Sequence, residues 1–319
     1  MTFDFSTIEG RITIGLAATM VASLVCWIQA LRRCGSFAVA IRALAPAEIR
    51  TAAFWSPLDA VMLMFLPAIA GSLVYAVLLT AGLATAPASS AEFQVRPDPL
   101  AFQFCKSVGN LAVILLGTLL LARRGPIWTS IGWPFRRRDL TLGWLWALLL
   151  IPPTLAINAS LNFVVQYEHP VLDLLAGQHD WAAIVLLFLG VASVTPIAEE
   201  FLFRGLLQGS MTRVAMTFGI RKELRDAETK SQRDRLIQQL HRYSPTDLTD
   251  APMWPIVVSS VIFAAMHLGQ GAAPIPLFVL ALGLGWLYRR TGRLWPSIIV
   301  HMLLNTLSLA VFLVAPDMG

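Results

Sequence analysis

The sequence predicts an all-α, polytopic membrane helical bundle with about eight transmembrane helices. The prediction rests on the composition, on long apolar segments and on the distribution of basic residues. Of the 319 residues, 56% are hydrophobic and only 13% are charged, whereas a soluble domain is typically about 25% charged. The mean hydropathy is +0.67. Lipid rather than water is therefore expected to surround most of the chain.

The apolar segments give the number of spans. A helix needs about 20 predominantly apolar residues to cross the hydrocarbon core of a bilayer. Eight segments meet or approach this requirement: Ile12–Leu31, Leu58–Leu83, Val108–Ala122, Leu142–Val165, Ala182–Gln208, Pro255–Leu268, Pro274–Tyr288 and Leu294–Val314. The third, sixth and seventh are short, so their existence is better defined than their ends.

The basic residues predict the orientation. Loops 32–57, 123–141, 209–254 and 289–293 carry 20 of the 24 Lys and Arg residues. Because cytoplasmic loops are enriched in Lys and Arg, we expect both termini to lie outside the cytoplasm. The protein is then an integral membrane protein, in the setting of a bacterial inner (plasma) membrane. The net charge of +5 follows from this topology, and no nucleic-acid partner is expected.

Charged residues inside spans are costly and are functional candidates by default. The fifth span contains Glu199, Glu200 and Arg204. Glu200 and Arg204 are four residues apart, so they share a helix face and can form a structural ion pair. Glu199 lies about 100° around the helix from Glu200 and needs a different partner.

Three further polar residues occur in the sixth and eighth spans. His267 lies near the far end of the sixth, and His301 and Asn305 share one face of the eighth. At about 1.5 Å per residue, Glu199 lies roughly 14 Å and His301 roughly 12 Å from the cytoplasmic ends of their spans. We therefore expect a shared site in the middle or the cytoplasmic half of the membrane.

The residue types indicate hydrolytic chemistry. A Glu and a His can together hold and deprotonate a water molecule, and a second His and an Asn can donate hydrogen bonds to a developing oxyanion. One Glu with two His is also a zinc-binding set, although the zinc-hydrolase signature HExxH is absent. Proton-coupled transport is an alternative interpretation, and so is a packing role for these residues.

The spacing of these residues resembles a known family. EExxxR at Glu199–Arg204, FxxxH at Phe263–His267 and HxxxN at His301–Asn305 are similar to the three motifs of the CPBP intramembrane proteases. These are also called CAAX-protease and bacteriocin-processing proteins, the Abi family. The stretch Gly285–Asn305 also looks like the third family region. The resemblance covers about residues 181–310.

The resemblance implies roles for the motif residues. Glu199 and His267 would activate the attacking water, and His301 and Asn305 would stabilise the tetrahedral oxyanion. Glu200 and Arg204 would hold the local structure. Family members are described both as metalloproteases and as glutamate-dependent enzymes, so the cofactor is either none or zinc. Zinc would be held by Glu199, His267 and His301.

With this resemblance, residues 1–140 are expected to form N-terminal transmembrane helices and basic cytoplasmic loops. Residues 141–319 are expected to form a CPBP-type protease core with a hydrophilic insert at about 209–254. The predicted function is an intramembrane endopeptidase whose partners are the lipid bilayer and a membrane-associated protein or peptide substrate. CAAX-processing relatives act on prenylated proteins, and nothing in this sequence shows that substrate. The alternative is a non-catalytic membrane scaffold or immunity protein that uses the same pocket for binding.

Overall fold

A computed structural model describes residues 8–48, 50–51, 53–84, 99–162, 181–239, 245–246 and 251–314. This part of the chain is almost entirely helical. The strands found in it are β1 (Arg50–Thr51) and β2 (Pro245–Thr246), which pair in antiparallel fashion. This short pairing joins the segment before α3 to the hydrophilic insert. The predicted helical membrane bundle is confirmed as the fold class.

Within the described residues, each predicted span corresponds to helical structure, and the end of the fourth, residues 163–165, lies outside them. The long helices are α1 (Ile8–Cys34), α3 (Pro57–Thr80), α4 (Pro99–Ala122), α6 (Arg137–Asn162), α12 (Trp254–Ala265), α13 (Pro274–Thr291), α14 (Leu294–Val314) and a rod that runs from α8 to α10. Within the described residues, six of these are long and apolar enough to cross a membrane. The two that fall short are α12, with 12 residues, and α13, whose last turn carries Arg289 and Arg290. The count of eight spans is therefore not confirmed.

The rod is a continuous helix whose pitch changes. Its segments are α8 (Trp181–Leu189), the π-helical η1 (Gly190–Val194), α9 (Thr195–Glu200), the π-helical η2 (Phe201–Gln208) and α10 (Gly209–Asp226). Pro196 lies at the start of α9 and has no N–H to donate to the preceding turn. Such a gap in the i→i−4 pattern is where a π-bulge forms, and π-bulges are frequent at functional sites. Glu199 and Glu200 lie between the two π-helical segments.

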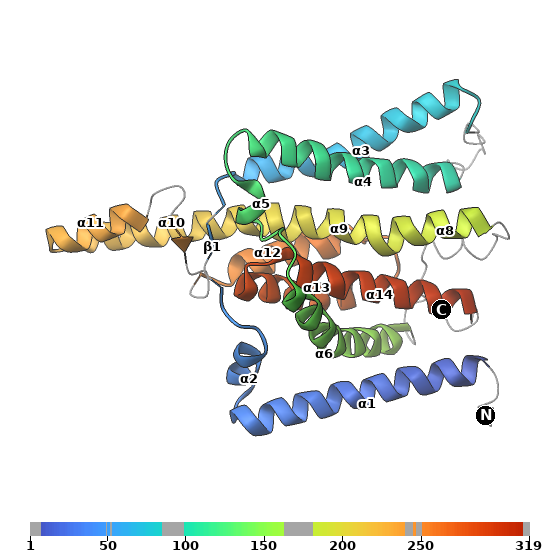
Figure 1. The fold of residues 1–319 in the computed structure, drawn as a ribbon, viewed down its shortest axis with the longest axis horizontal. Coiled ribbons are helices and arrows are strands. Elements are labelled where there is room, and N and C mark those ends of the chain that lie inside the picture. The colour runs from blue at the N-terminus through green and yellow to red at the C-terminus, as the bar shows by residue number, and fades with distance from the viewer. Residues whose placement is uncertain are drawn as a thin grey trace.

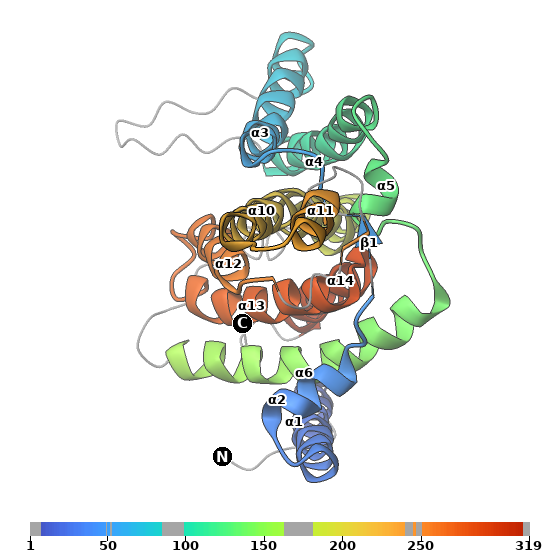
Figure 2. The same cartoon turned by 90° about the vertical axis from the view of Figure 1, so that its left-hand side faces the viewer.

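The helices form layers across the bundle. Figures 1 and 2 show α3 and α4 on one outer side, then the rod, then α12, α13 and α14, with α6 and finally α1 beyond them. The helices α2 (Phe37–Leu44), α5 (Ile127–Ser130) and α11 (Lys230–Gln239) are short. In Figure 1, α2, α5, α10 and α11 lie toward one end of the bundle, whereas α1 begins and α14 ends at the other. The basic loops of the sequence prediction thus share one end, which we call the basic end, and the opposite end is the terminal end.

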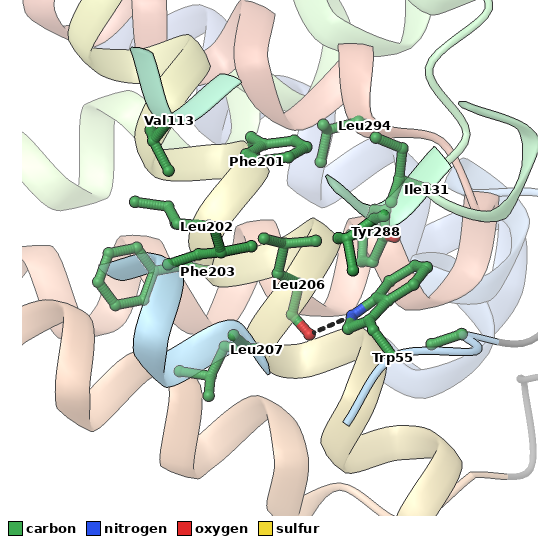
Figure 3. Close-up of a cluster of buried hydrophobic side chains, with 14 of the residues drawn as sticks. Trp55, Val113, Ile131, Phe201, Leu202, Phe203, Leu206, Leu207, Tyr288 and Leu294 are labelled. Atoms are coloured by element: carbon green, nitrogen blue, oxygen red, sulfur yellow. Dashed lines mark hydrogen bonds between the residues drawn. The ribbon is translucent and has the colours of Figure 1, made fainter. Parts of the chain in front are cut away.

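The largest core cluster surrounds η2. Trp55 reaches it from the segment between β1 and α3, and its indole N–H donates to the carbonyl of Leu206 at 2.8 Å (Figure 3). Phe201, Leu206 and Tyr288 pack in the same fully buried cluster. By contrast, the outer faces of α1, α3 and α4 expose large apolar side chains such as Val21, Met62 and Leu115. Apolar side chains on these outer faces are what a lipid-surrounded bundle requires.

Candidate active site

Glu200 is the buried centre of the polar cluster. Its side chain is fully inaccessible, with Oε2 3.1 Å from Arg204 Nε and Oε1 3.0 Å from His301 Nδ1. A buried carboxylate is stable only where charges and hydrogen-bond donors meet it. The sequence analysis predicted an ion pair between Glu200 and Arg204 and no other contact for Glu200. The structure corrects this, because Glu200 also holds the imidazole of His301.

His301 lies between the two adjacent glutamates. Its Nε2 is 3.6 Å from Glu199 Oε2, on the opposite side of the ring from Glu200. A neutral imidazole has one N–H and one acceptor nitrogen. With Nδ1 donating to Glu200, Nε2 can also donate only when the ring is protonated. Glu200 therefore determines which nitrogen of His301 is directed toward Glu199.

His267 lies just beyond the end of α12, not inside the span as the sequence predicted. Its Nδ1 is 2.9 Å from the carbonyl oxygen of Phe263. Because a carbonyl only accepts hydrogen bonds, Nδ1 carries the proton in this contact. The other nitrogen, Nε2, is then an acceptor in the neutral ring, which is the form that can receive a proton from water.

Phe263 packs against both imidazoles. Its ring centroid is 4.9 Å from that of His267 and 5.8 Å from that of His301. The Arg204 guanidinium lies over the same ring at 4.7 Å, in the range of a cation–π contact. The sequence analysis identified Phe263 only as the first residue of the FxxxH motif. Its four-residue offset from His267 was the available signal that the two side chains share a helix face.

Asn305 projects from α14 toward η1. Its Nδ2 donates to the carbonyl of Val191 at 2.9 Å. An amide NH2 has two donors, so one N–H of Asn305 is not committed by this bond. The sequence left Asn305 without a structural partner. The bond to Val191 now fixes the orientation of its amide.

One cavity collects all four residues proposed for catalysis. It has a volume of about 320 Å³, and Glu199, His267, His301 and Asn305 all line it. The other lining residues come mainly from α4, α6, η1, α13 and α14: Phe102, Gln103, Lys106, Thr154, Leu155, Asn158, Val191, Thr195, Gln270, Ala273, Pro276, Leu277, Leu304, Ser308 and Leu309. Residues from α4 take part, so the N-terminal part of the chain contributes to the wall of the cavity.

The cavity extends toward the terminal end of the bundle. His301 lies about 10 Å along the axis from the first residue of α14, close to the depth expected from the sequence. The residues of α4 that line the cavity lie near the beginning of that helix, and those of α6 lie near its end. Both positions are far from the basic loops.

The geometry does not supply a ready zinc site. Within the described part of the chain, no three His, Cys, Asp or Glu side chains are grouped so that they could hold a metal ion. Zinc requires its ligand atoms at about 2.0–2.2 Å. Glu199, His267 and His301 line one cavity without forming such a set.

The fold and the site together define a helical membrane protein with a buried Glu–His–Asn cluster at a cavity inside the bundle. A protein-family model described as type II CAAX prenyl endopeptidase Rce1-like matches residues 181–307. The match runs from α8 into α14 and contains all three motifs. It confirms the resemblance to the CAAX-protease family and supports an intramembrane endopeptidase. No curated protein and no solved structure matches the chain.

Proposed function

We propose that this protein is an intramembrane endopeptidase that hydrolyses a peptide bond of a membrane-associated protein or peptide. The attacking water is activated by Glu199 and His267. The observation that carries the proposal is that Glu199, His267, His301 and Asn305 line the same cavity, although they come from three separate segments of the chain.

The two adjacent glutamates differ in their access to water. The Glu199 side chain is 21% exposed, whereas Glu200 is fully buried and held by Arg204 and His301. Glu199 is therefore the carboxylate that a water molecule in the cavity can reach. It accepts one proton of that water while Nε2 of His267 accepts a hydrogen bond from the other. Such general-base assistance contributes typically about 10²–10⁴-fold to a rate.

His301 and Asn305 supply the donors for the oxyanion. As the water oxygen bonds to the scissile carbonyl carbon, negative charge develops on the carbonyl oxygen. The uncommitted N–H of Asn305 and the Nε2–H of protonated His301 can donate to it, and prepositioned donors of this kind stabilise the transition state strongly. The carbonyl then re-forms, the C–N bond breaks, and the proton held by Glu199 passes to the nitrogen of the leaving amine, which completes the hydrolysis.

The wall of the cavity fits a peptide inserted from a membrane. Apolar residues such as Leu155 and Leu277 alternate with polar residues such as Thr195 and Gln270. Extended peptide backbone needs hydrogen-bond partners that lipid does not provide, and these polar groups can supply them. The proposal covers membrane-associated substrates with or without a prenyl group.

The direct test is Glu199→Gln, which keeps the size of the side chain and removes the base. We expect cleavage to fall by at least about 10²-fold while thermal stability in detergent stays within a few degrees of the wild type. Substrates are found by comparing the termini of membrane proteins in cells that carry the wild type or the variant. Glu223→Gln, on the exposed surface of α10, is the matched control and should keep full cleavage.

The competing functions give different results in the same variant. A scaffold or immunity protein keeps its biological activity in Glu199→Gln, and no protein termini differ between the two cell lines. A transporter loses ion-coupled flux and also yields no processed product. Metal analysis of the purified protein, with cleavage measured in the presence of a chelator, tests zinc directly.

A further inference from the structure

A single lysine lies in the wall of the cavity. Lys106 is the only charged residue among the 24 residues of α4, and it lies about 10 Å along the axis from the beginning of that helix. Charged residues within spans are costly, and they almost always face the bundle interior or a water-filled cavity on a substrate or ion pathway. Lys106 follows this rule, since it lines the cavity that contains Glu199.

The ammonium group of Lys106 has no anionic partner in the described part of the chain. Among the described Asp, Glu, Lys and Arg residues, only Lys106 and Glu199 line the cavity. Glu199 lies beside His301 rather than Lys106, and Lys106 forms no ion pair with any described residue. A positive charge inside a membrane span is therefore left without a partner at the wall of the candidate active site.

Neighbouring residues keep this wall polar. Gln103 is buried one turn before Lys106, and its Nε2 lies 3.5 Å from Ser107 Oγ. Both side chains pack against Gly190 in η1, where an added Cβ would lie 2.6 Å from each of these atoms. The glycine thus lets α4 approach the rod closely and brings its polar face to the cavity. Asn158 of α6 adds a further polar group to the lining.

We propose that Lys106 is a specificity-determining residue that binds a carboxylate of the substrate. The carboxylate is either the C-terminal group of the chain or the side chain of an Asp or Glu. A hydrogen bond between an ammonium and a carboxylate is charge-assisted and stronger than a neutral one. The proposal rests on the proposed function, because the bound peptide is the one presented to Glu199. It assigns a residue outside the matched region 181–307 to substrate recognition.

The experiment measures binding separately from cleavage. The full chain carrying Glu199→Gln, in phospholipid nanodiscs, is titrated with an N-palmitoylated fluorescent hexapeptide of apolar residues. The peptide is made in three forms: with a free C-terminal carboxylate, with a C-terminal amide, and with a C-terminal amide plus one Glu. We expect the first form to bind about tenfold more tightly than the second. The third form shows whether an acidic side chain can replace the terminal carboxylate.

Adding Lys106→Met to the same chain should remove this preference without changing the affinity for the amide. Lys106→Arg should keep the preference, because it keeps the charge. Arg123→Met, at the other end of α4 and outside the cavity lining, removes one positive charge as well and should have no effect. This control separates a local contact from a change in overall charge.

Two results would overturn the assignment. The first is equal affinity for all three peptide forms in the chain that retains Lys106, including no binding of any of them. The second is an unchanged preference in Lys106→Met. Failure of the endopeptidase proposal looks different, because Glu199→Gln would then cleave membrane proteins as well as the wild type does, whatever the binding data show.

Discussion

Glu199 and Glu200 show how two neighbouring residues of the same type come to differ. They are separated by about 100° around the helix, so one faces the cavity and the other faces the protein interior. The sequence predicted this separation and the Glu200–Arg204 contact, because both follow from local helix geometry. It could not predict the bond from Glu200 to His301, because that bond depends on how α14 packs against the rod.

The buried contacts of Glu200 lead to a prediction about stability. Glu200→Gln leaves the Arg204 guanidinium buried without its anion, and breaking a buried pair in this way costs about 3–5 kcal/mol. The double variant Glu200→Gln/Arg204→Met removes both charges, so it should be more stable than the single variant. The free energy of unfolding, measured by denaturant titration in mixed micelles, checks the order. A double variant less stable than Glu200→Gln would show that the two charges do not depend on each other.

The same two variants separate stability from function. In both variants an uncharged amide replaces the carboxylate at His301 Nδ1, so the protonated form of His301 is no longer stabilised there, and cleavage should remain low in the double variant even where stability recovers. Cleavage that recovers together with stability would mean that the charge of Glu200 is not needed at His301.

For the helices, the sequence predicted which segments are helical, but it did not predict where each helix ends. Gly269 and Gly271 adopt positive φ angles of 94° and 56°, a conformation that glycine adopts without strain. They follow the end of α12 and place His267 in a turn rather than in the span. The two glycines were visible in the sequence and are a typical signal of a helix C-terminus. The π-helical segments were not predictable, because their apolar pattern differs little from that of an α-helix.

The N-termini of α6 and α14 are joined by a buried ion pair. Arg293 donates to both oxygens of the fully buried Asp139, from Nε at 2.5 Å and from the terminal nitrogen at 2.7 Å. Asp139 also accepts a bond from the backbone N–H of Arg136, which caps the start of α6. The hydrogen bond to Asp139 raises the pKa of Arg293 above its ordinary value, although burial lowers it. The guanidinium therefore stays charged at any working pH.

We expect Arg293→Met to destabilise the protein by about 3–5 kcal/mol, because it leaves Asp139 buried without its cation. Arg124→Met is the matched comparison, since Arg124 pairs with Asp59 at 2.6 Å but is 43% exposed. An exposed pair contributes less than about 1 kcal/mol. Unfolding free energies of the two variants, measured under the same conditions, test the contrast. Equal losses would mean that the Asp139 pair is not the connection that holds α6 to α14.

For the whole molecule, the sequence pointed to the polar residues of the candidate site but not to the other helices that line the cavity around them. The motifs named four of the residues that line the cavity, Glu199, His267, His301 and Asn305, because these lie in the family-like region of the chain. The contribution of α4 through Lys106 was not predictable, because a lone lysine near a helix end also fits an interfacial anchor. The orientation expected from the sequence also conflicts with the expected position of the site. The basic loops predict that the termini lie outside the cytoplasm and that the site lies in the middle or the cytoplasmic half of the membrane. In the structure, the cavity extends toward the terminal end of the bundle.

The orientation can be measured with single cysteines at the two ends of the bundle. In a chain whose Cys26, Cys34 and Cys105 are replaced by Ala, Leu83→Cys, just after the end of α3, reports on the terminal end, and Arg225→Cys reports on the basic end. Both positions are exposed. The enrichment of Lys and Arg in cytoplasmic loops predicts that a membrane-impermeant maleimide labels Leu83→Cys in intact cells. Arg225→Cys should be labelled only after the cells are opened.

This result would place the terminal end, toward which the cavity extends, on the non-cytoplasmic side, so the substrates would be membrane proteins with cleavable segments outside the cytoplasm. The reverse labelling would mean that the cavity opens to the cytoplasm and that the basic loops face outward against the usual charge rule. In either orientation Glu199 lies about 14 Å along the rod from Gln208, and His301 lies about 10 Å from the start of α14. The side from which a peptide reaches Glu199 is then set by the direction in which the cavity opens, and not by the depth of the catalytic residues.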